Sequence, residues 1–286
     1  MRMRIIIGLG LLMLTTIVVL ALATTGGSRR GDGGAPQVVA AFYPLAFAAE
    51  QIAPGARVRN LTPPGAEPHD LEIAPSAVRE LKSADLVLLM GHGFQPQIER
   101  AAGTGARVMR LLDTPGLSAH AGDPHVWLDP IRYAAIARRI GSEMDRRRPA
   151  ERFIARLKAL DRSFRAGLSR CRRREIVTSH EAFAYLAERY RLRQIAITGI
   201  SPEAEPAPRA LEHAVQLVRA TAARTVYFET LVSPRLADTV ARETGARTAV
   251  LDPIEGLTPA EQRAGEDYFS VMRRNLSRLR AGLGCA

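Results

Sequence analysis

Residues 149–171, PAERFIARLKALDRSFRAGLSRC, decide the architecture, because they predict one long helix in the middle of the chain. Apolar side chains recur there at helical spacing, and Pro149 stands at the start, where a helix tolerates proline. The apolar positions are Phe153, Leu157, Leu160, Phe164 and Leu168. A helix of about 22 residues is a rod about 33 Å long. We therefore expect a stiff helical connection between two halves of the chain instead of a flexible Gly/Ser hinge.

Both flanking regions alternate short β-branched or aliphatic runs with helical segments. Strands separated by helices favour right-handed parallel βαβ units. The predicted fold class is therefore α/β, with two open parallel-sheet βα lobes joined by one long rigid helix. The predicted domains are an N-terminal lobe at 36–148, the linking helix at 149–171 and a C-terminal lobe at 172–286. The predicted strands are 38–42, 57–61, 85–90, 107–112, 175–179, 193–199, 225–229 and 247–251.

The composition excludes a disordered or fibrous chain and gives no support to nucleic-acid binding. The 286 residues are 47% hydrophobic and 24% charged, which suffices for a buried core. The net charge is +11, from 40 Lys+Arg against 29 Asp+Glu, but the arginines are scattered along helical stretches. Aromatic residues make up only 5% of the chain, and no basic segment is rich in them. Base stacking needs such aromatic side chains, so we expect no nucleic-acid partner.

The first residues predict export from the cytoplasm. Basic Met1-Arg2-Met3-Arg4 precedes an apolar run at 5–23 that ends in the small-x-small triplet Ala21-Leu22-Ala23. This is the pattern of a secretory signal, with an uncleaved membrane anchor as the alternative. A Gly-rich leader follows, so we interpret 1–35 as a signal or anchor segment and flexible leader. The body of the protein is then expected in the periplasm or at the cell surface.

The chain has two cysteines, Cys171 and Cys285. Export to an oxidising compartment favours a disulfide between them. Two unpaired thiols are the alternative.

Four side chains with metal-binding chemistry follow predicted strands or lie in the loops between lobes. His69 lies in PPGAEPHDLEIAPS, His125 in DPHVWLDP, His180 closes EIVTSH and Asp252 closes RTAVLD. Ligands of open parallel sheets bind outside the carboxyl ends of the strands, so we expect a metal site at the lobe interface. Three imidazoles and a carboxylate suit Zn²⁺, with Ni²⁺ or Cu²⁺ as alternatives, whereas Mn²⁺ favours more oxygen ligands. Glu67 is the alternative to Asp252 as the oxygen ligand.

Several neighbours of these residues admit a structural or a functional interpretation. Asp129, which precedes a proline, is expected to cap a helix, although it is also placed to orient a ligand histidine. Glu229 is interpreted as support for a ligand or as a salt-bridge partner at the cleft edge. Trp127 is expected to pack in the core, and His92 to lie in a surface loop or at the rim of the site.

Six stretches follow one another in a distinctive order: AFYPLAFAAEQIAPG, PPGAEPHDLEIAPSAVRELKSADLVLLMG, PHVWLDP, SHEAFAYLAERY, GISPEAEPAPRAL and YFETLVSPRLADTVARETGARTAVLDPIEGL. In this order they resemble the zinc/manganese-binding solute-binding proteins of ABC importers, over nearly all of the mature chain. The resemblance implies His69, His125, His180 and Asp252 as ligands. Histidine at the third place is similar to the zinc-type members, whereas manganese-type members tend to carry glutamate there.

The chain departs from the family in one loop. Many zinc-type members have a long His- and acid-rich loop before the second ligand, and here the stretch is GLSAHAGDP with the single His120. We therefore expect no metal capture by that loop.

The function implied by the resemblance is high-affinity capture of a divalent metal, with zinc expected and manganese as the alternative. The partner is an ABC permease in the cytoplasmic membrane, and the binding protein is expected to be a monomer. Four protein ligands leave no open position for the water that hydrolysis on zinc needs. A zinc hydrolase with Glu67 or Glu229 as general base is the rival class, but the chain has no H-E-x-x-H, G-x-S-x-G or phosphate-loop motif. We therefore predict a binding protein and no enzyme.

Overall fold

The computed structural model describes residues 34–286 except 104–106, 118–119, 121, 203–207 and 222. Residues Ala35–Ala286 form one compact unit that contains both sheets. The predicted signal or anchor segment and most of the leader lie outside the described residues. No helix in the described part of the chain has the length and apolar character needed to cross a membrane.

All eight predicted strands are present, and they form two parallel four-stranded sheets, which confirms the predicted fold class. The first sheet has the strand order β2-β1-β3-β4 and the second has the equivalent order β6-β5-β7-β8. The strands are β1 Gln37–Ala40, β2 Arg57–Asn60, β3 Leu86–Leu89, β4 Val108–Arg110, β5 Glu175–Thr178, β6 Arg193–Ala196, β7 Thr225–Phe228 and β8 Arg247–Val250.

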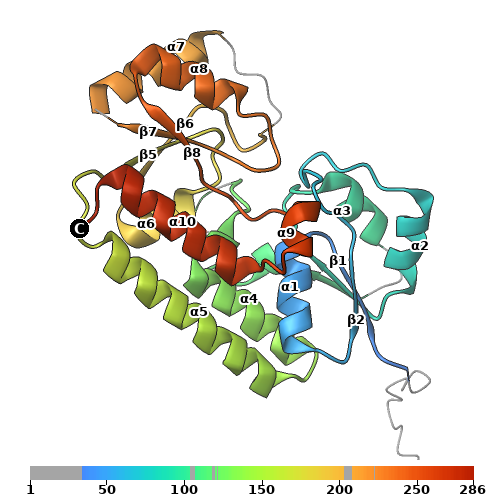
Figure 1. Cartoon of the computed structure of the whole chain (residues 1–286). Coiled ribbons are helices and arrows are strands. Elements are labelled where there is room, and N and C mark those ends of the chain that lie inside the picture. Colours follow the sequence, from blue (N-terminus) through green and yellow to red (C-terminus); the bar gives the residue numbers. More distant parts are fainter. Residues whose placement is uncertain (1–33, 104–106, 118–119, 121, 203–207, 222) are drawn as a thin grey trace, which may run out of the picture. The chain divides into compact units, whose positions relative to one another are not determined.

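Burial explains which runs become central strands. β3, with the sequence LVLL, is buried throughout because helices cover both faces of a parallel sheet. The edge strand β2 reads RVRN, and its two arginines are exposed. Helices α2 and α3 lie on one side of the first sheet and α1 on the other (Figure 1). The helices are α1 Tyr43–Ile52, α2 Pro75–Ser83, α3 Pro96–Ala102, α4 Pro130–Glu143, α5 Arg147–Leu168, α6 Ala184–Tyr190, α7 Pro208–Thr221, α8 Arg235–Thr244, α9 Pro259–Arg263 and α10 Tyr268–Leu283, with 3₁₀ turns η1 Leu111–Asp113 and η2 Val126–Leu128.

The predicted long helix is α5, which begins at Arg147 and ends at Leu168 instead of spanning 149–171. Its five predicted apolar positions are all buried. However, α5 is more than a spacer, because it packs against α1 and α4 and also against α6 and α10 (Figure 1). One hydrophobic cluster therefore runs through α5 from the first sheet to the C-terminal helix, while a second cluster lies between the second sheet and α7 and α8. The lobe boundaries 36–148 and 172–286 stay a prediction.

A buried carboxylate ties α5 to α6. Asp161 accepts hydrogen bonds from Arg189 Nε at 2.7 Å, Arg165 Nε at 3.0 Å and the Tyr190 hydroxyl at 3.2 Å. Burial alone would raise the pKa of Asp161, but the hydrogen bonds from Arg189 and Arg165 lower it below its ordinary value. The ionised form of Asp161 is therefore the one that stabilises the fold.

Replacing Asp161 by Asn should lower the free energy of unfolding at pH 7 by about 1–3 kcal/mol, because hydrogen bonds between charged groups are lost. Since the folded-state pKa is depressed, this contribution is complete above the ordinary carboxyl pKa of about 3.9 and is lost as pH falls through the lower folded value. Urea unfolding from pH 7 to 3 measures the difference in unfolding free energy between the wild type and the variant. This difference should shrink below about pH 4. The exposed Glu243→Gln serves as a control. A difference in unfolding free energy that grows in acid would contradict a stabilising role for ionised Asp161.

The predicted disulfide between Cys171 and Cys285 is present. It joins the segment after α5 to the segment after α10, across a sequence separation of 114 residues. Backbone hydrogen bonds from Arg172 to Gly284 and from Arg173 to Leu283 accompany it. The C-terminus is thus tied to the start of the second half of the chain.

The double variant Cys171→Ser/Cys285→Ser should lose up to about 4–5 kcal/mol of unfolding free energy, because the unfolded chain is no longer cross-linked. Urea unfolding of this variant and of the wild type with and without reductant tests the expectation. Coincident unfolding curves for all three samples would show that the cross-link adds no stability.

Candidate metal centre

The structure brings the three predicted histidines together around one carboxylate. His69 comes from the loop after β2, His125 directly precedes η2 and His180 follows β5. The carboxylate is that of Glu255, in the loop after β8, whose Oε1 lies 3.0 Å from His69 Nε2, 2.8 Å from His125 Nε2 and 3.7 Å from His180 Nε2. We call these four residues the His₃–Glu cluster.

Asp252, the predicted acidic ligand, does not join this cluster. Its Oδ1 accepts a hydrogen bond from the Ile254 backbone N–H at 2.7 Å, and its Oδ2 accepts one from the Thr230 hydroxyl at 2.9 Å. Oδ1 is thus bonded within its own loop and Oδ2 to the loop after β7, and Glu255 lies where the sequence analysis expected Asp252. Sequence reasoning missed Glu255, and the signal that could have identified it is a carboxylate in the apolar stretch IEGL, in the same loop after the last strand.

The His₃–Glu cluster has the spacing of a tetrahedral metal site. One ligand atom from each of its members lies within 4.8 Å of all the others. The two Nε2 atoms of His125 and His180 are 3.5 Å apart. Ligand atoms about 2.0–2.1 Å from a tetrahedral Zn²⁺ are about 3.3 Å from one another, so small shifts suffice to accommodate an ion. All four members are buried.

A second set of carboxylates orients the imidazoles. Asp123 Oδ1 lies 2.7 Å from His125 Nδ1, and Glu229 Oε1 lies 2.6 Å from His180 Nδ1. These hydrogen bonds turn both Nε2 atoms towards the centre of the cluster, as carboxylates do for metal-bound histidines. The interpretation of Glu229 as support for a ligand fits this geometry.

Glu67, the alternative oxygen ligand, acts within its own loop. Its carboxylate accepts hydrogen bonds from the His69 backbone N–H at 2.9 and 3.0 Å, and its Oε1 lies 3.8 Å from His69 Nε2. The same loop contacts the loop of Glu255, because Gly65 N–H donates to the Leu257 carbonyl at 2.9 Å. Gly65 has φ of 82°, and a Cβ there would lie 3.2 Å from Pro259 Cδ, so glycine suits this approach.

The carboxylates and imidazoles of the cluster shift one another's pKa values. Burial alone would raise the pKa of Glu255, but hydrogen bonds from the imidazoles hold it well below its ordinary value. Burial alone would lower the pKa of His180, yet Glu229 and Glu255 raise it to about 10. Burial also opposes the shift at His125, whose pKa Asp123 and Glu255 raise. Protons on the imidazoles thus balance the carboxylates, and a bound cation would serve the same purpose.

The acid loop, residues 251–258, presents Glu255 through a strained backbone. Ile254 has φ of 59°, a left-handed conformation that a β-branched residue rarely adopts and that costs about 1–3 kcal/mol. The hydrogen bond from its N–H to the Asp252 carboxylate holds this turn. Asp252 therefore positions the neighbouring carboxylate of Glu255.

Helix α10 and the core hold the acid loop from behind. Asn275, fully buried, accepts from the Asp252 N–H at 3.0 Å and donates to the Asp252 carbonyl at 2.6 Å. Trp127 Nε1 donates to the Pro253 carbonyl at 2.7 Å, and the Tyr268 hydroxyl donates to the Trp127 carbonyl at 2.7 Å. Trp127 is thus a core residue, as predicted, and it also anchors the loop.

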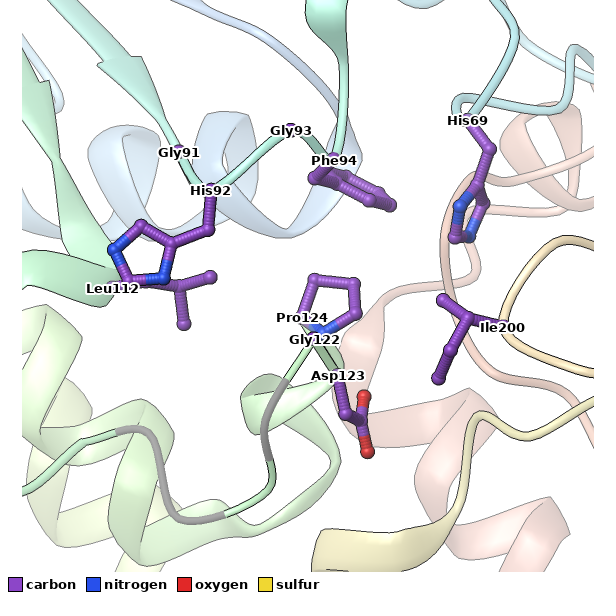
Figure 2. A pocket seen from close by; sticks show the side chains of 10 residues that line it. All are labelled: His69, Gly91, His92, Gly93, Phe94, Leu112, Gly122, Asp123, Pro124 and Ile200. Carbon is purple, nitrogen blue, oxygen red and sulfur yellow. The ribbon is translucent and has the colours of Figure 1, made fainter.

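A small pocket of about 80 Å³ leads to the cluster beside His69. Figure 2 shows His69 and Ile200 on one side of it and His92 on the other, with Phe94 and Pro124 between them. His69 is 8% exposed, whereas His125 and His180 are fully buried. His69 is therefore the member of the cluster nearest to solvent.

Three further residues singled out in the sequence lie outside the cluster. Asp129 caps α4 through hydrogen bonds to the backbone of its first turn, as predicted. His92 lines the pocket and its Nε2 lies 3.0 Å from Asp113 Oδ1. His120 Nε2 lies 3.1 Å from Glu188 Oε2 at the surface.

Two parallel α/β sheets whose loops converge on buried imidazoles and a carboxylate define the class of two-lobed solute-binding proteins. The family model for the periplasmic zinc-uptake complex component A, ZnuA, matches residues 38–282, and the chain belongs to this family.

Two curated relatives illustrate the similarity. The zinc-binding lipoprotein AdcA of Streptococcus pneumoniae is 32% identical over 94% of this chain and 60% of its own length. The high-affinity zinc uptake system protein ZnuA of Bacillus subtilis is 30% identical over 91% of this chain and 92% of its own length. The chain thus spans about three fifths of the AdcA relatives and nearly the whole of the Bacillus protein.

Solved structures agree with the fold. The laminin-binding protein of Streptococcus agalactiae, described as an adhesin with metal-transporting activity, has a TM-score of 0.79 at 27% identity and covers 87% of this chain and 99% of its own. The Zn(II)-bound ZnuA-like domain of Streptococcus pneumoniae AdcA has a TM-score of 0.75 at 32% identity, with the same coverage of 87% and 99%.

Replacing Asn275 by Ala should weaken binding of a divalent cation, because the acid loop loses both of its hydrogen bonds to α10. Titration with Co²⁺, followed by its visible absorption, measures the affinity. We expect a loss of about 10–100-fold, the cost of removing an outer hydrogen-bond partner at a metal site.

The matched control is Leu279→Ala, which removes another fully buried side chain from the same helix. It should lower the free energy of unfolding by about 2–5 kcal/mol and leave Co²⁺ affinity nearly unchanged. Equal losses of Co²⁺ affinity in both variants would show that Asn275 contributes only to packing and does not position the acid loop.

Proposed function

We propose that this protein captures Zn²⁺ outside the cytoplasm and delivers it to an ABC permease, using His69, His125, His180 and Glu255 as ligands. The observation that carries the proposal is the convergence of four buried ligand atoms, two from loops of each sheet, within 4.8 Å of one another. Membership of the zinc-uptake family supports the same function.

Zinc is favoured over manganese by the chemistry of the donor set. Three imidazole nitrogens and one carboxylate match the tetrahedral preference of Zn²⁺, whereas Mn²⁺ prefers more oxygen ligands. The names of the relatives, zinc-binding lipoprotein and zinc uptake system protein, support this choice.

The same donor set favours capture over catalysis. A catalytic zinc keeps an open position for water, whereas four protein donors fill a tetrahedral shell. The two carboxylates weighed as general bases are engaged elsewhere, because Glu229 hydrogen-bonds to the His180 imidazole and Glu67 accepts from the His69 backbone N–H. We therefore propose a binding protein and not a hydrolase.

Release to the permease follows from where the ligands lie. All four are in loops or at strand ends, and they come from two separate sheets, so a small relative movement of these loops breaks the shell. The permease as partner and the extracytoplasmic location are inferred from the family. We propose that the binding protein acts as a monomer.

Three variants separate the proposed ligands from their neighbours. His180→Ala and Glu255→Gln each remove a ligand and should weaken Zn²⁺ binding beyond the roughly 10–100-fold that loss of an outer partner costs. Asp252→Asn keeps an oxygen for the Ile254 N–H, so its effect should stay within about 10-fold. Competition with a chromophoric chelator measures the affinities.

The opposite order, with Asp252→Asn abolishing binding and Glu255→Gln nearly silent, would return the ligand role to Asp252. X-ray absorption at the zinc edge gives a second measurement, in which we expect three nitrogens and one oxygen from protein. A bound water together with turnover of simple esters would favour the hydrolase instead. Competition by Mn²⁺ at equal affinity would remove the preference for zinc.

A further inference from the structure

A second pocket, of about 330 Å³, lies at the opposite ends of the strands from the metal centre. Arg173 precedes β5, Arg224 precedes β7 and Arg247 begins β8, so these side chains gather at the amino ends of the second sheet. Arg278 of α10 completes the lining. Figure 1 shows α10 passing beside β8. We call these four residues the arginine pocket.

The four guanidinium groups of the arginine pocket have no protein partner among the described residues. None of them forms an ion pair or a side-chain hydrogen bond there, and no acidic residue lines the pocket. Some arginines elsewhere are paired. In another pocket Arg165 and Arg189 pair with Asp161 and Arg174 donates to the Leu168 carbonyl, whereas the exposed Arg191 of that pocket forms no ion pair among the described residues.

Two of the four arginines, Arg173 and Arg278, are half-buried in the pocket, and the exposed Arg224 and Arg247 add positive charge at its edge. Guanidinium groups stay charged in proteins, and each offers five donors and no acceptor. Burial, together with the neighbouring charge of Arg274, lowers the pKa of Arg278, and the carboxylates of Asp252 and Glu261 offset this only in part. The threonines Thr225 and Thr248 also line the pocket with hydroxyl groups. An anion would supply both acceptors and negative charge to these donors.

We propose that the arginine pocket binds an anion that carries two or more phosphate groups. Bidentate arginine contacts suit the planar array of phosphate oxygens, and several arginines around one ligand match more than one negative charge. The volume exceeds the need of a single phosphate. Either the headgroup of an anionic phospholipid or a soluble oligophosphate presents this chemistry.

The arginine pocket is independent of the metal centre and of the function proposed for it. The His₃–Glu cluster lies beyond the carboxyl ends of the strands, whereas this pocket lies at their amino ends. Zn²⁺ affinity should therefore not change when Arg224 and Arg247 are replaced.

The test uses tripolyphosphate as the probe and isothermal titration calorimetry on the purified chain. Arg224→Gln/Arg247→Gln removes two exposed members of the pocket, and Arg173→Gln/Arg278→Gln removes the two half-buried ones. Each pair should weaken binding about tenfold or more, the cost of losing charge-assisted hydrogen bonds. The control Arg57→Gln/Arg79→Gln removes the same charge from exposed positions outside the pocket and should change the affinity less than twofold.

Vesicles distinguish the two sources of phosphate. If the ligand is a headgroup, the wild type should sediment with vesicles containing cardiolipin and not with neutral phosphatidylcholine, and tripolyphosphate should compete. If the ligand is soluble, tripolyphosphate should bind while the vesicles do not.

Two results would overturn the proposal. One is an equal loss of tripolyphosphate binding in the pocket and control pairs, which would show that binding depends only on the net positive charge of the protein. The other is the absence of binding to both probes at low salt. Unchanged Zn²⁺ affinity and thermal unfolding identify variants that are folded, and the exposed pair Arg224→Gln/Arg247→Gln provides the test if the half-buried pair misfolds.

Discussion

The Glu255 carboxylate is the group on which the candidate metal centre depends. Its Oε1 lies within 3.0 Å of the Nε2 atoms of His69 and His125, which belong to loops of the first sheet, although Glu255 itself follows the last strand of the second. A buried charge of this kind is tolerated only when partners surround it. The metal centre therefore requires that several loops converge on Glu255. Hydrogen bonds fix the conformation of each of these loops.

The loops of the metal centre are held mostly by hydrogen bonds between side-chain carboxylates or amides and backbone groups. Glu67 holds the His69 N–H, and Asp252 holds the Ile254 N–H. The Asn275 side chain accepts a hydrogen bond from the Asp252 N–H and donates one to the Asp252 carbonyl. Hydrogen bonds to carboxylate oxygens in a buried site are strong, so they offset the strain of the left-handed Ile254. The ligands can then sit in loops and still be held within a few ångströms of their positions.

The core explains why the loops meet at all. Helix α5 packs on helices from both halves of the chain, and the disulfide ties its end to the C-terminus after α10. Because α10 carries Asn275, the same packing that completes the core also places the acid loop. Stability and the geometry of the centre are linked through this helix.

The sequence by itself determined the eight strands, the long helix, the disulfide partners and the three histidines that meet. Each of these depends on local periodicity, on residue type or on the rule that parallel strands end at one edge. Only the tertiary structure shows that Glu255, and neither Asp252 nor Glu67, joins the three histidines. Asp252 and Glu255 lie in one short loop, and the direction of each side chain depends on the turn at Ile254 and on Asn275, over 20 residues away in the chain. The arginine pocket was hidden for the same reason. Its members are scattered from Arg173 to Arg278. A pattern within a short stretch of sequence does not indicate which distant side chains lie on the same surface.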